Sequence, residues 1–120
     1  MTEYVILLPG DESAWENSPP EAKEAMYAVH RRFAQALEER GHKVTGGTEL
    51  APSREAKVLH TGADGTHTVT DGPYAETVEQ LTGFYVVESE DLDDLLDVCK
   101  ILGRGESAIE IRAAAAGPGS

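Results

Sequence analysis

The chain has 120 residues, of which 22 are acidic and 10 are basic, so its formal charge at neutral pH is −12. This length corresponds to one domain, which we assign to residues 1–113, followed by a flexible tail of small residues at 114–120. Because binding to phosphates or to an anionic membrane requires a basic face, the charge argues against nucleic acid and against membrane surfaces as partners.

Cysteine content and the N-terminal residues bear on the cellular compartment. The single cysteine, Cys99, has no partner for an internal disulfide, and the N-terminus lacks a signal-peptide pattern. The longest fully apolar run near the N-terminus, Tyr4–Leu8, is far shorter than the ~20 residues that a membrane-spanning helix needs. The sequence therefore predicts a cytoplasmic protein without a membrane segment.

The first part of the chain predicts a strand, a loop and a long helix. Glu3–Leu8 is an apolar run rich in β-forming residues, which is typical of a buried strand, and Asp11–Asn17 is expected to be a polar loop. The segment Ser18-Pro19-Pro20-Glu21 predicts a helix start with Ser18 as its cap. Gly41 is expected to end this helix. One face of the helix is apolar and comprises Ala22, Met26, Val29, Phe33 and Leu37.

Short β-like segments follow. His42–Leu50 is interrupted by Gly46-Gly47, which predicts a bulge or a bend. Lys57–Thr61 and Thr66–Thr70 flank a glycine-containing connection and predict a hairpin. Thr82–Glu88 has the strongest β propensity of the chain.

A second helix and a last strand complete the domain. The helix is expected to start near Ser89–Asp91, with acidic residues in its first turns that complement the helix dipole. Ala108–Arg112 alternates apolar and charged residues, which predicts a half-exposed strand. The apolar stripe of the helix comprises Leu92, Leu95, Leu96, Cys99 and Leu102.

This order of elements predicts an α+β fold. Two helices separated by antiparallel strands favour a ferredoxin-like sandwich of the form βαβ-hairpin-βαβ, with both helices on one face of the sheet. The strands contain apolar side chains on both faces, so the other face needs a cover. The simplest cover is a second copy of the same sheet, which predicts a homodimer.

The acidity is concentrated in one region. Val58–Cys99 contains ten Asp or Glu residues and no Lys or Arg, whereas the other 78 residues hold twelve acidic and ten basic residues. This region is a candidate surface for a basic protein partner, and such binding would weaken steeply with salt.

A long motif within this region resembles a known family. Val69–Thr77 reads VTDGPYAET, and Glu79–Tyr85 reads EQLTGFY. The two segments resemble the DGPF family of YCII-related proteins, and the similarity extends from about Tyr4 to Arg112. The sequence departs from the family pattern, which has Phe, Lys and Gly at these positions, at Tyr74, Val78 and Thr82.

The resemblance implies an assembly, a site and a context. It implies a dimeric α/β barrel made by two ferredoxin-like subunits, and a cleft with a catalytic His–Asp pair. His30, which precedes Gly41 by eleven residues, matches the histidine of that pair. The resemblance also implies a link to extracytoplasmic-function sigma factors, and hence an accessory role in transcriptional signalling, without an established activity.

Three residues are candidates for acid–base chemistry. His30 lies on the apolar helix face, so its ring is expected to point towards the sheet, and an imidazole suits proton transfer near neutral pH. The alternative is a half-buried histidine bonded to a backbone carbonyl. Asp71 is a candidate partner of His30 or a general base, and Glu76 can join the same site. The alternative for Asp71 is a turn residue that binds its own backbone before Gly72-Pro73.

Three aromatic residues, Tyr4, Trp15 and Tyr85, are candidates to line a ligand cleft, although aromatic strand residues also form cores and interfaces. His60 and His67 flank the hairpin turn, but two histidines do not make a metal site, so no metal is expected. The chain has no glycine-rich phosphate loop and no nucleophile motif, and no cofactor is expected.

Two functions from different classes fit these observations. The first, which we prefer, is a dimeric domain that binds a small organic ligand in a cleft without catalysis. The second is a small enzyme that uses His30 and a carboxylate as an acid–base pair. A sizeable pocket that contains both groups would favour the enzyme. A shallow pocket, or one filled by Met26 and Phe33, would favour binding or a structural role.

Overall fold

The computed structural model describes residues 1–103 and 108–115. It contains a four-stranded antiparallel sheet in the order β2-β5-β1-β6 and a separate two-stranded hairpin, β3-β4. This mixed α+β architecture confirms the expected fold class and is consistent with a ferredoxin-like arrangement. The strands are β1 (Thr2–Asp11), β2 (Lys43–Glu49), β3 (Lys57–Thr61), β4 (His67–Asp71), β5 (Glu79–Ser89) and β6 (Glu110–Ala113), and the helices are α1 (Glu12–Glu16), α2 (Pro20–Glu39) and α3 (Leu92–Cys99), with a 3-10 turn at Ser53–Glu55.

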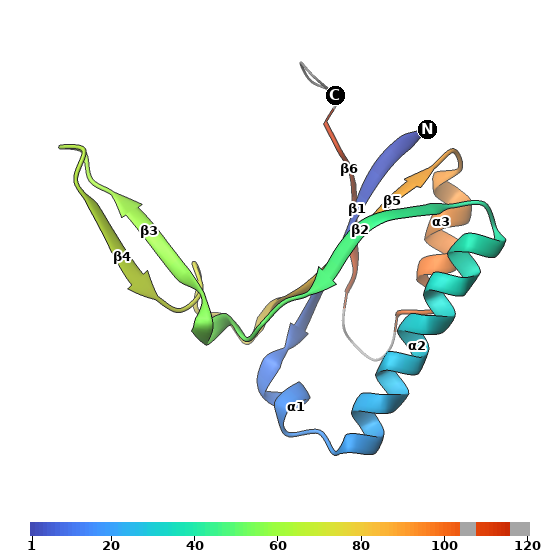
Figure 1. Cartoon of the computed structure of the whole chain (residues 1–120), viewed down its shortest axis with the longest axis horizontal. Helices are drawn as coiled ribbons and strands as arrows, with labels where there is room; N and C mark the ends of the chain where they lie inside the picture. The colour runs from blue at the N-terminus through green and yellow to red at the C-terminus, as the bar shows by residue number, and fades with distance from the viewer. Residues whose placement is uncertain (104–107, 116–120) are drawn as a thin grey trace.

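Helices α2 and α3 lie on the same side of the sheet, as Figure 1 shows. The core forms between them and the two central strands, because alternate residues of a strand point to the same face. Ile6 of β1 and Val87 of β5 are fully buried there, against Phe33 and Leu37 of α2 and Leu95 of α3. The apolar face expected for α2 is therefore largely confirmed, with Val29, Phe33 and Leu37 as its buried residues.

The expected start of α2 is wrong in its detail. Pro19, not Ser18, is the N-cap, it makes no side-chain cap, and the helix begins at Pro20. The hydroxyl of Ser18 donates instead to the carbonyl oxygen of Trp15, which belongs to α1. Ser18 is therefore unavailable as a cap, because it closes the preceding helix.

The segment Asp11–Asn17, expected to be a loop, contains the short helix α1. The carboxylate of Asp11 accepts a hydrogen bond from the backbone N–H of Ala14 at 3.1 Å and caps this helix. Five helical residues are too few to show a periodic apolar pattern, which is why the sequence did not predict them.

Helix α3 begins as expected after Asp91, whose side chain caps it by accepting from the N–H of Asp94. Its buried face differs from the predicted stripe, because Val98 is buried while Leu92 and Leu96 are each 41% exposed. The buried positions follow an i, i+3, i+4, i+7 pattern on a single face. They are Leu95, Val98, Cys99 and Leu102, and burial raises the pKa of the Cys99 thiol to about 11, so this thiol stays protonated.

Two glycines occupy conformations that other residues rarely adopt. Gly41 follows α2 with a φ of 82°, as expected for a helix-ending glycine. Gly47 has a φ of 129°, and a Cβ atom there would lie 2.4 Å from the carbonyl oxygen of Phe84. The expected bulge in β2 is confirmed as a register shift between Val44 and Gly46.

The β3-β4 hairpin extends away from the rest of the molecule, on the side opposite to α2 and α3 (Figure 1). The Cα radius of gyration is accordingly 16.8 Å, whereas about 14 Å is expected for a compact domain of this length. Leu59 and Val69 face each other across this hairpin and are 62% and 63% exposed. An isolated two-stranded sheet is only marginally stable, so this arm lacks the packing that normally stabilises such a pair.

The chain beyond β6 is described only in part. The N–H of Ala114, a residue of the expected tail, donates to the carbonyl oxygen of Glu3 at 2.8 Å. Residues 116–120 of that tail lie outside the described residues. Within the described ranges, no helix is both long enough and apolar enough to cross a membrane.

Candidate functional site

A cleft of about 760 Å³ lies between α1, the first half of α2 and the adjoining ends of β1, β2 and β5. This volume is within the usual range for sites that bind small molecules. Apolar and polar side chains both line the cleft. Those that matter most for the chemistry are Trp15, Met26, Tyr27, His30, Glu49 and Tyr85.

His30 and Tyr85 form a hydrogen-bonded pair in this cleft. The Nδ1 atom of His30 lies 2.7 Å from the hydroxyl oxygen of Tyr85, and the two rings are stacked with centroids 5.9 Å apart. The ring of Tyr85 also packs on Phe33, with centroids 5.1 Å apart, so the buried core supports the pair from behind.

Burial influences the protonation states of the His30 imidazole and the Tyr85 phenol. Desolvation lowers the pKa of His30, and the nearby negative charge of Glu49 opposes this effect. Desolvation also raises the pKa of Tyr85. A neutral imidazole therefore faces a protonated phenol near neutral pH. Such a pair can present both a hydrogen-bond donor and an acceptor to a ligand, and the imidazole can take up a proton.

A second polar pair, Tyr27 and Glu49, lies one helical turn from His30. The hydroxyl of Tyr27 donates to the carboxylate of Glu49, at 3.2 Å and 3.3 Å to its two oxygens. The edge of one ring in the Tyr27–Trp15 pair meets the face of the other, with centroids 5.6 Å apart. No motif in the sequence pointed to Tyr27 or Glu49 as site residues. The i, i+3 spacing of Tyr27 and His30 was the available signal for Tyr27, whereas Glu49 becomes a neighbour only when β2 packs beside α2.

The structure brings together three of the six predicted site residues, namely Trp15, His30 and Tyr85. It does not bring the other three into the cleft. Tyr4 packs against the hydrophobic core. Asp71 lies at the end of β4 in an ion pair with Lys57, and its side chain is 78% exposed. Glu76 is exposed in the connection between β4 and β5.

The expected pairing of His30 with Asp71 is therefore absent within one chain. Asp71 belongs to the extended hairpin, whereas His30 belongs to α2, and the group that contacts His30 is the phenol of Tyr85. The carboxylate that influences His30 electrostatically is that of Glu49.

The two hairpin histidines do not face each other. His60 is opposite Thr68 and His67 is opposite Thr61, so the two histidines point to opposite faces of the hairpin. Each is exposed, and each is hydrogen-bonded to a threonine hydroxyl. Within residues 1–103 and 108–115, no group of three or more potential metal ligands is found.

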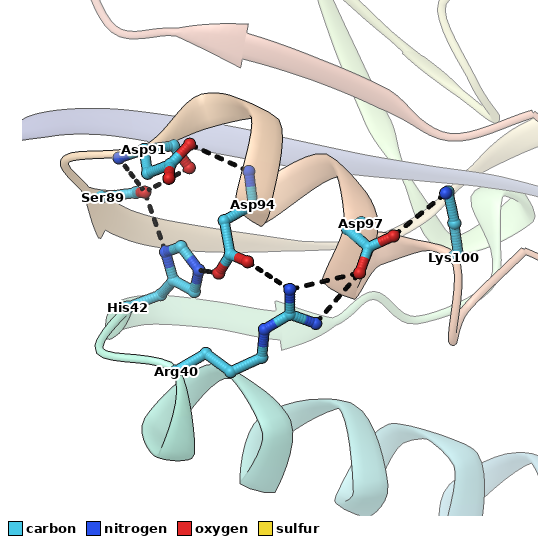
Figure 2. A network of polar contacts seen from close by, with 7 residues as sticks. All are labelled: Arg40, His42, Ser89, Asp91, Asp94, Asp97 and Lys100. Atoms are coloured by element: carbon cyan, nitrogen blue, oxygen red, sulfur yellow. Dashed lines mark hydrogen bonds and ion pairs between the residues drawn. The ribbon is translucent and has the colours of Figure 1, made fainter.

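A polar network joins α2, β2, β5 and α3 at a place outside the cleft (Figure 2). The ring of His42 lies between Ser89 and Asp94, with Nδ1 2.8 Å from the Ser89 hydroxyl and Nε2 2.7 Å from the carboxylate. Arg40 bridges Asp94 and Asp97, and Lys100 binds Asp97 at 3.0 Å.

The order hydroxyl, imidazole, carboxylate in this network is that of a nucleophile with its base. Ser89, however, is only 1% exposed, and none of Ser89, His42 and Asp94 lines the cleft. A substrate has no access to the hydroxyl, so the network is structural: it connects the end of α2 to the start of α3.

This network predicts a loss of stability in acid. Hydrogen bonds from Arg40 and then His42 lower the pKa of Asp94, and hydrogen bonds from Lys100 and then Arg40 lower that of Asp97. A carboxylate with a lowered pKa in the folded state stabilises the protein above its unfolded-state pKa of about 3.9, and this contribution disappears as the pH falls through the folded-state pKa. We expect the free energy of unfolding to fall as the pH decreases below about 5.

The check is urea unfolding at a series of pH values, with the double variant Asp94→Asn, Asp97→Asn beside the wild type. The variant should be less stable at neutral pH and should lose less stability than the wild type on acidification. Because both carboxylates are partly exposed, added salt should reduce the difference. Equal slopes for the two proteins would contradict the assignment.

The fold and the cleft define the class of this protein: a small α+β domain with an antiparallel sheet, two helices on one face and a cavity of ligand size beside the sheet. The family model described as the YCII-related domain matches residues 2–113. An uncharacterized protein of Rhizobium meliloti (strain 1021) is 36% identical over 103 residues, which cover 82% of this chain and 78% of that protein. The chain therefore belongs to the YCII-related family. The narrower resemblance to DGPF proteins stays a prediction.

Proposed function

We propose that this protein binds a small organic ligand in the cleft, with the His30–Tyr85 pair as its polar anchor. The observation that supports this most is the convergence of Trp15, His30 and Tyr85, from α1, α2 and β5, on one cavity of about 760 Å³. Aromatic walls with a few convergent polar groups are typical of small-molecule sites. A binding role also fits the accessory function in transcriptional signalling that the family resemblance implies, since signalling requires no turnover.

This proposal predicts that His30→Ala and Tyr85→Phe each weaken ligand binding by about ten-fold, because each removes a hydrogen-bonding group from a partly desolvated site. Tyr85→Phe keeps the ring that packs on Phe33, so the fold should survive. A fragment library of small organic compounds is screened by changes in protein NMR shifts, and the hits are titrated against each variant.

His60→Ala is the matched control, because His60 is an exposed histidine on the hairpin. It should leave the affinity of every hit unchanged. The proposal fails if no fragment shifts the resonances of cleft residues, or if hits bind His30→Ala and Tyr85→Phe as tightly as the wild type.

The second candidate function is acid–base catalysis by His30, which the lowered pKa of His30 and its 2.7 Å contact with Tyr85 favour. The same titrations separate the two functions. A hit that the wild type converts, and His30→Ala binds without converting, would identify an enzyme. A hit that is bound and recovered unchanged by both proteins would identify a binding domain.

We also propose that the protein forms a homodimer through the sheet face opposite to α2 and α3. Val5 pairs with Val86 and Leu7 with Phe84 on this face, and all four side chains are only partly buried. Helices α2 and α3 lie on the other side of the sheet and leave these apolar side chains without a helical cover (Figure 1). A second copy would cover these apolar pairs, and two such sheets face to face would form the α/β barrel that the resemblance implies.

Replacing Leu7 by Glu is expected to convert the dimer to a monomer, because it places a charge at the centre of the contact. Sedimentation equilibrium should give about twice the 12.9 kDa chain mass for the wild type and the single mass for the variant. Ala34→Glu, which adds the same charge on the exposed side of α2, should remain dimeric. A wild-type protein that sediments as a monomer would refute the dimer.

The acidic region remains a proposed surface for a basic protein partner. Several of its carboxylates have cationic neighbours within the chain, since Asp71 pairs with Lys57, Asp94 with Arg40, and Asp97 with both Arg40 and Lys100. The partner would therefore meet the remaining acids, and its binding should weaken steeply with salt.

A further inference from the structure

The charges around the cleft limit what it can bind. Among the described residues, its walls contain four carboxylates, from Asp11, Glu12, Glu16 and Glu49, and one ammonium group, from Lys23. Burial lowers the pKa of His30, so its imidazole is neutral near pH 7 and does not offset these charges. The described walls of the cleft therefore carry more negative than positive charge.

Three of these carboxylates accept hydrogen bonds from neutral groups. Asp11 binds the N–H of Ala14, Glu12 binds the N–H and hydroxyl of Ser53, and Glu49 binds the hydroxyl of Tyr27. All of these donors are neutral. Among the described residues, only Glu16 of the four forms an ion pair, with Arg54. Hydrogen bonds from neutral groups hold a carboxylate in place without cancelling its charge.

Aromatic faces at the same cleft add attraction for cations. The ammonium of Lys23 lies 5.8 Å from the centroid of the Trp15 ring and 3.4 Å from the carbonyl oxygen of Glu16. The chain thus already places one primary ammonium over an aromatic face in this cleft. Tyr27, which holds Glu49 and contacts Trp15, brings a second ring next to a carboxylate. An aromatic ring beside a carboxylate is the chemistry that recognises organic cations.

We infer that the ligand of this cleft is an organic cation, an amine with an apolar or aromatic body, and that Glu49 is the residue that selects it. This inference rests on the proposed ligand-binding function of the cleft. The ammonium pairs with the Glu49 carboxylate, and the body packs against Trp15 and the apolar wall that includes Met26. An anionic ligand is disfavoured, because the carboxylates that line the cleft outnumber its described cations and repel it.

The test uses three probes that share one phenol ring and differ in charge: tyramine (cation), p-ethylphenol (neutral) and p-hydroxyphenylacetate (anion). Trp15 is the only tryptophan of the chain and lines the cleft, so its fluorescence, excited where phenols do not absorb, reports binding there. Tyramine should bind about ten-fold more tightly than p-ethylphenol, and p-hydroxyphenylacetate should bind most weakly. The preference should decrease with salt.

Glu49→Gln keeps the shape of the side chain and removes its charge, so it should reduce the preference of the cleft for tyramine over p-ethylphenol to a small factor. Glu38→Gln, an exposed position of α2 outside the cleft, should leave that preference unchanged. Absence of tyramine binding, or binding of p-ethylphenol or the anion as tight as that of tyramine, would overturn the inference. Neither result would refute ligand binding itself, which the fragment titrations with His30→Ala and Tyr85→Phe decide separately.

Discussion

Replacing Phe33 by alanine is expected to lower the free energy of unfolding by about 3–5 kcal/mol, the usual cost of removing a fully buried phenyl ring. Phe33 is fully buried between the sheet and the helices, in the same core cluster as Ile6, Leu37 and Leu95. The lost ring leaves a cavity in this cluster, because buried neighbours relax only partially into such a space. Urea unfolding followed by far-UV circular dichroism measures the effect.

The same substitution should also disturb the cleft. The ring of Phe33 packs on Tyr85, which holds His30, so its loss leaves the phenol free to tilt. Phe33→Leu, which retains most of the apolar volume, should cost much less and keep the protein folded for binding measurements. Arg32→Ala, an exposed change on the same helix, should alter stability by no more than about 0.5 kcal/mol. Equal stabilities for Phe33→Ala and Arg32→Ala would contradict the assigned core.

Replacing His42 by alanine is expected to cost about 2–3 kcal/mol, because it removes two hydrogen bonds in a buried setting and leaves space behind. The His42 side chain is only 3% exposed. It joins Ser89, at the end of β5, to Asp94 in the first turns of α3. Without the His42 ring, the contacts between α2 and α3 keep their apolar side chains and the Arg40 ion pairs. They lose the two buried hydrogen bonds that His42 makes.

The control for this prediction is again His60→Ala, which removes an exposed histidine from the hairpin and should be nearly neutral. Unfolding should be measured at one protein concentration, since the proposed dimer would make apparent stability depend on concentration. The cleft lies outside the network, so His42→Ala should bind the fragment hits with unchanged affinity as long as it is folded. A stability equal to that of His60→Ala would show that the network contributes nothing.

Local patterns predicted most of the secondary structure. The periodic apolar face of α2, the glycine that ends it, the bulge in β2, the hairpin and the acidic start of α3 all depend on residues close together in the chain. The errors arose where local patterns compete or are too short. Ser18 lies in a sequence suited to capping α2, but its hydroxyl donates to α1 instead. Helix α1 itself is too short to show a periodic apolar pattern.

The candidate site was only half predictable for the same reason. Trp15, His30 and Tyr85 could be named individually from residue type and helix position, and all three line the cleft. Asp71 belongs to a conspicuous motif, which predicts a functional role, but the hairpin extends that motif away from α2. Glu49 was missed because nothing in its neighbouring residues distinguishes it, and its role depends on β2 lying beside α2.

The charge of the chain likewise has one part that the sequence predicts and one part that depends on the fold. Residue patterns along the chain are enough to establish the fold class, the family and the concentration of ten acidic residues between Val58 and Cys99. The folded arrangement is needed to see that another set of carboxylates, from residues outside that region, lines the cleft. It also shows that Asp94 and Asp97 pair with Arg40. Composition gives only the total charge of the chain. Binding depends on the electrostatic potential at the site, which is set by the charged residues that the fold brings together there.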